Sequence, residues 1–119
     1  MNTNADIAVT DADVAAFRAD GAVVLRGPFA EWVEILRAGV ARNIEAPGPD
    51  ARIYDGSAGK GRHFGDYCNW DRIPEFRRFI FESPAARIAA RLMGSRSVRL
   101  FHEHVLVKEP GTTQRTPWH

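Results

Sequence analysis

Hydrophobic and polar residues follow two different periods along this chain, helical in its first part and alternating near its end. Residues 10–19 have helical spacing, with Thr10 as the N-cap and Gly21 as the residue that ends the helix. The apolar, β-branched run at residues 22–26 lies between glycines, and it predicts a short buried strand.

The longest apolar stripe of helical spacing covers residues 29–44. It includes Gly39, whose missing side chain would let another element approach closely. Two further helices are expected later in the chain. Pro74 is suited to the first turn of one of them, and the Ser-Pro pair at 83–84 starts the other, which Gly94 ends.

Proline and glycine interrupt the pattern over residues 45–62, which predicts a long loop that either forms a lid or crosses a pocket mouth. Residues 63–71 are aromatic but irregular. Residues 97–108 then alternate with a period of two and are rich in β-formers, which predicts a long strand. Because neither face of this strand is wholly polar, we expect it to be covered on both sides, as in a barrel or a sandwich.

This long strand has no evident partner in the sequence. The strand expected at 22–26 is short and lies far back in the chain, and a long unpaired strand edge is an aggregation hazard. We therefore expect the chain to be part of a longer protein whose further strands complete the sheet.

Composition narrows the class of protein. The chain has 119 residues, 45% of them hydrophobic and 26% charged, which is typical of one soluble globular domain. Its net charge of +1 and interspersed signs argue against a nucleic-acid binder. Cys68 is the single cysteine, so no disulfide forms within the chain, and no apolar run is long enough to span a membrane. We expect a cytoplasmic protein, whose oligomeric state the sequence leaves open.

Two histidines on the predicted long strand are candidates for metal binding. His102 and His104 project from one face, about 7 Å apart along the backbone. With Glu109 five residues later, the spacing is similar to the first metal motif of the cupins, although Arg96 and Thr116 stand where that motif has glycines. A cupin-like metal site is one alternative, and polar side chains lining a barrel interior are the other.

An ordered set of segments resembles the phytanoyl-CoA dioxygenase family. It comprises Asn-Trp-Asp-Arg-Ile-Pro-Glu-Phe from residue 69, the Ser-Pro helix from residue 83, Val-Arg-Leu-Phe-His-Glu-His-Val-Leu-Val-Lys-Glu-Pro-Gly-Thr from residue 98, and Thr-Pro-Trp-His at 116–119. The segment from Phe17 to Leu25 is similar to the family's opening helix, turn and strand. The resemblance covers nearly the whole chain and is weakest over residues 45–62.

This resemblance implies a non-haem Fe(II)/2-oxoglutarate dioxygenase. His119 would be the first of three iron ligands. The other two, an Asp and a second His, would come after residue 119 in the family's order. Lys108 would bind a carboxylate of 2-oxoglutarate, as a cation where water is scarce. The substrate would be a small molecule of unknown identity, in a pocket with four candidate lining residues: His102, His104, Thr116 and Trp118.

The expected fold is α+β. The N-terminal helical region, residues 1–96, would pack on the start of a double-stranded β-helix (jelly-roll) barrel, of which residues 97–119 would be the first long strand and the metal-motif loop. Residues 1–119 would thus form the N-terminal part of one oxygenase domain. The parent protein would hydroxylate its substrate while decarboxylating 2-oxoglutarate, whereas the isolated chain would be inactive. A non-catalytic module that binds a partner through its strand is the competing class.

Overall fold

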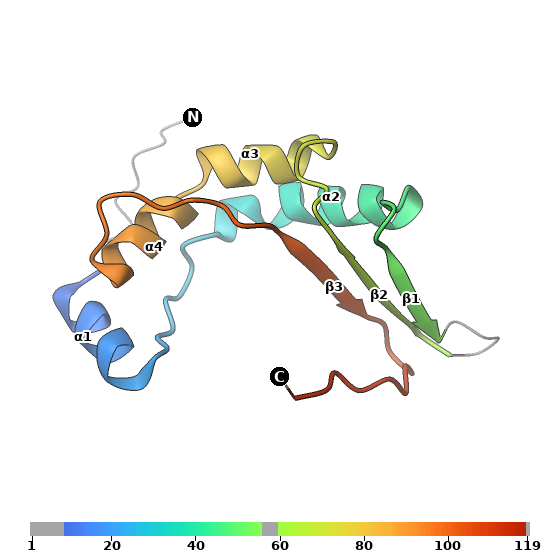
Figure 1. Ribbon diagram of the computed structural model, residues 1–119, viewed down its shortest axis with the longest axis horizontal. Helices are drawn as coiled ribbons and strands as arrows, with labels where there is room; N and C mark the ends of the chain where they lie inside the picture. The colour runs from blue at the N-terminus through green and yellow to red at the C-terminus, as the bar shows by residue number, and fades with distance from the viewer. Residues whose placement is uncertain (1–8, 56–59, 119) are drawn as a thin grey trace.

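The computed structural model describes residues 9–55 and 60–118. Over these residues the chain forms four α-helices, one short 3₁₀ helix and three strands: α1 (Asp11–Asp20), η1 (Ala30–Trp32), α2 (Val33–Glu45), β1 (Arg52–Asp55), β2 (Arg62–Tyr67), α3 (Pro74–Glu82), α4 (Ala85–Met93) and β3 (His104–Lys108). Helices α2 and α3 pack together, α1 packs on α4, and the sheet lies at the opposite end from α1 (Figure 1). The α+β class is therefore confirmed.

The helix boundaries follow the capping residues. Asp13 N–H donates to the Thr10 hydroxyl at 3.1 Å, and the Asp13 carboxylate accepts from Thr10 N–H at 2.9 Å, so the two residues cap α1 reciprocally. Gly21 and Gly94 end α1 and α4 in the left-handed region, with φ of 75° and 64°. Helix α3 begins at Pro74 as predicted, and α4 begins at Ala85, directly after the predicted Ser-Pro start.

Helix α3 lies against α2 at Gly39, as the sequence predicted. A Cβ at Gly39 would lie 2.7 Å from Phe76 Cε1 and 2.9 Å from Glu75 Cβ, so only glycine permits this approach. The Phe79 ring packs edge-on against Trp32 at a centroid distance of 5.6 Å. Arg42 of α2 also binds the Glu75 carboxylate through Nε and Nη2. Apolar packing and an ion pair together hold the two helices.

The sheet departs most from the sequence predictions. The strand predicted at residues 22–26 is wrong: this segment has no regular secondary structure and pairs with no described strand, and Val24 is 74% exposed. The predicted loop at 45–62 contains β1 and the first residue of β2, and the rest of β2 lies in the segment at 63–71 that was predicted to be irregular. Of the long strand predicted at 97–108, only His104–Lys108 is in the sheet. The local hydrophobic pattern did not predict the strand positions, because a strand forms only where another strand is present to pair with it.

The expectation that the late strand lacks a partner is also wrong. Strand β2 pairs antiparallel with both β1 and β3, and the order β1-β2-β3 leaves β1 and β3 as edges within the described part of the chain. The described strands form an open sheet and do not close a barrel. The jelly-roll prediction is therefore supported only at the level of an α+β fold with an antiparallel sheet.

The strand register separates two faces of the sheet. The face toward the helices carries buried Phe64 and Asp66 and the half-buried Val105 and Val107. The opposite face is open and carries the following side chains: Arg52, Tyr54, His63, Gly65, Tyr67, His104, Leu106 and Lys108.

A buried carboxylate joins the sheet to the helical layer. Asp66 is fully buried, and it accepts hydrogen bonds from Asn43 Nδ2 at 2.8 Å, Gly48 N at 2.7 Å and Tyr67 N at 2.9 Å. Burial raises the pKa of Asp66, but these hydrogen bonds, together with one from the Asn69 side chain, outweigh it and leave the pKa below its usual value. The carboxylate therefore stays ionised, and its hydrogen bonds connect β2 to α2 and to the loop after α2.

A neighbouring set of polar contacts connects the end of β2 to the segment that leads into α3. Arg72 Nε donates to Asn69 Oδ1 at 2.8 Å, and the Asn69 amide donates to the Tyr67 carbonyl at 2.9 Å. Asn69 N–H donates to the Glu103 carboxylate, and Cys68 N–H donates to the Glu103 carbonyl. The segment between β2 and α3 is thus fixed to the residue just before β3.

The Gly39 contact yields a test of helix packing. Glycine to alanine in a helix normally stabilises by about 1 kcal/mol, whereas overpacking a close contact costs about 1–3 kcal/mol. We expect Gly39→Ala to lower the free energy of unfolding, measured by urea denaturation, because Phe76 and Glu75 leave no room for the methyl group. A rise in stability would contradict the packing described.

Candidate functional site

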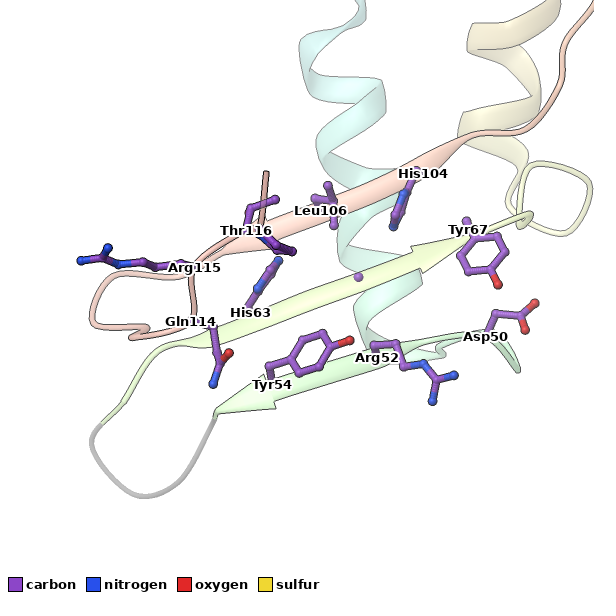
Figure 2. Close-up of a pocket in the computed structure, with 12 residues that line it drawn as sticks. Asp50, Arg52, Tyr54, His63, Tyr67, His104, Leu106, Gln114, Arg115 and Thr116 are labelled. Atoms are coloured by element: carbon purple, nitrogen blue, oxygen red, sulfur yellow. The ribbon is translucent and has the colours of Figure 1, made fainter. Parts of the chain in front are cut away.

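A cavity of about 530 Å³ lies over the open face of the sheet (Figure 2). This volume is within the range of small-molecule sites, which is roughly 300–1,000 Å³. Side chains from all of the described strands and from the segment after β3 line it: Asp50, Arg52, Tyr54, His63, Gly65, Tyr67, His104, Leu106, Gln114, Arg115, Thr116 and Pro117.

Gly65 forms the floor of the cavity. It is buried in the central strand, with Arg52 of β1 and Leu106 of β3 as its cross-strand partners. A Cβ here would lie 3.3 Å from Leu106 Cδ2 and 3.8 Å from His104 Nε2, so a larger side chain would fill the space. The absent side chain is what hollows the middle of this face.

Tyrosine and histidine pairs stand at both ends of the floor. Tyr54 and His63 are cross-strand partners with ring centroids 5.6 Å apart, and Tyr67 and His104 form a second pair at 5.6 Å in an edge-on arrangement. His63 is buried, whereas the other three rings are exposed. The two pairs leave an apolar and aromatic trough between them.

Charge in the cavity is net positive. Arg52 and Arg115 contribute two positive charges and Asp50 one negative charge, which leaves +1 with the histidines neutral. Among the described residues, neither arginine forms an ion pair, in contrast to Arg42, Arg62 and others outside the cavity. The Arg115 side chain points away from the sheet, and the Arg52 guanidinium lies at the outer edge of β1 (Figure 2).

The rim of the cavity is held by the turn after β3. Glu109 binds Arg62 through both carboxylate oxygens, with Nη2 at 2.6 Å and Nε at 3.0 Å from Oε1, and it also accepts from Arg62 N–H at 2.8 Å. These contacts lower the Glu109 pKa to about 2. A Cβ at Gly61 would lie 2.1 Å from the Pro110 carbonyl oxygen, so the hairpin and this turn approach as only glycine allows. The segment that follows the turn is therefore directed back over the open face.

Two of the four predicted pocket residues line the cavity. His104 and Thr116 are both in its wall, although they come from the strand and from the loop after it. His102 lies outside the lining, with its ring 4.6 Å from Phe101 and 6.0 Å from Tyr67. Trp118 is fully exposed and does not line the cavity either.

The predicted iron and cosubstrate residues are not gathered into a site. Lys108 is on the open face by register, but its ammonium donates to the Gln114 carbonyl at 3.2 Å and does not line the cavity. His119 lies outside the described residues. Within 9–55 and 60–118, no group of three or more His, Cys, Asp and Glu side chains is arranged to hold a metal ion. The cupin alternative gains no support, because Glu109 is bound to Arg62.

Sequence reasoning missed Arg52, Tyr54 and His63. Their signal was two short alternating runs, Arg-Ile-Tyr and His-Phe-Gly-Asp-Tyr, flanking a glycine-containing segment, which is the usual pattern of a hairpin. The proline and glycine content around these runs favoured a loop instead. Nothing in the sequence could place Gln114–Pro117 beside them, because that contact depends on the Arg62–Glu109 tie.

No match to a family model, to a curated protein or to a solved structure is found for this chain. The helices within the described ranges include none long and apolar enough to cross a membrane.

The Arg62–Glu109 contact predicts a pH dependence. The folded pKa of Glu109 is about 2, below the ordinary 4.5, so its contribution to stability is fully present above about pH 4.5 and is lost as pH falls toward 2. Glu109→Gln should remove this component. We expect the difference in melting temperature between the two proteins to shrink as pH is lowered from 6 to 3, and a constant difference would contradict the assignment.

Proposed function

We propose that this chain is the N-terminal part of a non-haem Fe(II)/2-oxoglutarate dioxygenase that acts on a small molecule. The observation that carries the proposal is the cavity itself: His104 and Thr116, expected from the family resemblance to lie at the pocket, line one cavity with Arg52 and His63. Residues 114–117 also line the cavity beside the sheet, which supports the proposal because the resemblance places this segment directly before the metal motif.

The open face of the sheet supports the same proposal. Leu106 is 57% exposed and Tyr54 is 48% exposed on a face that otherwise lines a cavity. In an oxygenase barrel a second sheet would cover such a face, and the additional strands would also pair with the free edge of β3. Lys108 remains the proposed contact for 2-oxoglutarate, and its ammonium donates to the carbonyl of Gln114, which lines the cavity.

The described residues do not fit an iron centre by themselves. Neither His102 nor His104 has a third ligand near it, and Glu109 is committed to Arg62. The proposed role of this chain is therefore to build one wall of the pocket, to position the substrate and to exclude water from it. No chemical step is assigned to its own residues.

A binding module is the second candidate function. Its support is the edge of β3, which is unpaired among the described residues and follows an extended segment in which Phe101 is 93% exposed. A strand from another chain could pair there through backbone hydrogen bonds. This candidate predicts a defined oligomer or complex rather than turnover.

Succinate formation in the presence of Fe(II) and 2-oxoglutarate tests the oxygenase proposal. We expect no turnover by the 119-residue chain, and turnover by a protein that also contains the residues its gene encodes after His119. His119→Ala should abolish that activity, while His102→Ala, on a side chain outside the cavity, should retain most of it. A stop codon after His119, or activity indifferent to His119→Ala, would contradict the proposal.

A further inference from the structure

We infer that the cavity on the open face binds a small monocarboxylate with a planar, apolar body, and that Arg52 anchors its carboxylate. The inference deepens the proposed function by giving the class of the substrate. Only the role of this ligand as a substrate rests on the proposed function. Its binding requires neither iron nor 2-oxoglutarate.

The floor of the cavity fits a flat ligand. Gly65 leaves the centre of the sheet face without a side chain, and Leu106 provides an apolar flank beside it. The pairs Tyr54–His63 and Tyr67–His104 bound the floor at its two ends. A planar ring or short acyl body placed on Gly65 would contact Leu106 on one flank and the aromatic pairs at its two ends, with Arg52 on the other flank.

Arg52 is placed to bind an anion at the β1 edge of this floor. It is the cross-strand partner of Gly65 and lines the cavity, and its guanidinium lies at the outer edge of β1, on the side away from β2 (Figure 2). Its side chain has no ion-pair or hydrogen-bond partner among the described residues, whereas Arg42 and Arg62 are each held by a carboxylate. A free guanidinium beside an apolar floor binds a carboxylate bidentately.

The other charges limit the anion to a single carboxylate. Asp50 lines the cavity toward the Tyr67 end, where it would repel a second negative group (Figure 2). Arg115 points away from the sheet, so the second arginine does not add to the charge over the floor. The hydroxyls of Tyr54 and Tyr67, which make no hydrogen bond to a described residue, are available to a polar substituent on the ligand. A phosphate ester or a dicarboxylate would fit this arrangement less well.

Titration of the 119-residue chain with phenylacetate, followed by amide shifts in two-dimensional NMR, tests the inference. We expect saturable shifts centred on Arg52, Gly65 and His104. Phenylacetamide, which has the same ring without the charge, should bind about tenfold more weakly or worse, as should acetate, which lacks the ring.

Arg52→Gln should weaken phenylacetate binding by about tenfold, while Arg99→Gln, an exposed arginine outside the cavity, should leave it unchanged. Gly65→Val, which fills the floor, should also remove binding. The comparison of phenylacetate with phenylacetamide uses the unmodified chain and so does not depend on a variant that folds. Absence of saturable phenylacetate binding, equal binding of the amide, or binding unchanged by Arg52→Gln would overturn the inference. Phenylacetate binding by the 119-residue chain, together with no succinate formation by the longer protein, would sink the oxygenase proposal and leave the carboxylate site standing.

Discussion

The ionised carboxylate of Asp66 is the contact on which the rest of this structure depends. It is fully buried in the central strand, yet it is held by donors from α2, from the loop after α2 and from its own strand. An unpaired buried charge would cost several kcal/mol, so the surrounding donors must stay in place for the carboxylate to remain. Among the described residues, the largest fully buried side chains are Ile73, Asn43, Asn69 and Asp66, so polar groups make up most of this set.

The position of the cavity follows from the hydrogen bonds that hold Asp66 against the helical layer. With Asp66 directed at the helices, alternation directs Gly65 and Tyr67 to the opposite face, where the hollow forms. Strand β2 is central, so fixing it also fixes β1 and β3, which bring Arg52 and His104 to the two sides of the floor. The helical layer and the candidate site thus share one strand but use its two faces.

The sequence predicted the helices well because their signals are local. The residues that begin or end a helix act within one turn of their own position, as Thr10, Pro74 and Gly94 do. The close helix contact at Gly39 was predicted from its place on an apolar stripe. The strands were predicted poorly because a strand needs a partner. Residues 22–26 have strand composition but pair with no strand in the described part of the chain, while Arg52–Asp55 has a weak pattern but pairs with β2. His104 and Thr116 were found through a family resemblance, whereas Arg52 and His63 needed the hairpin to be known.

Unfolding of an Asp66→Asn variant, compared with Asp71→Asn at an exposed position, tests the central claim most directly. Asparagine keeps the shape but presents an NH₂ group to at least one of the donors that now face the carboxylate. The account predicts that Asp66→Asn lowers the free energy of unfolding by about 2–3 kcal/mol and weakens the amide protection of β2 and β3, while Asp71→Asn changes little. Equal stability of the two variants, with the sheet amides still protected, would contradict it.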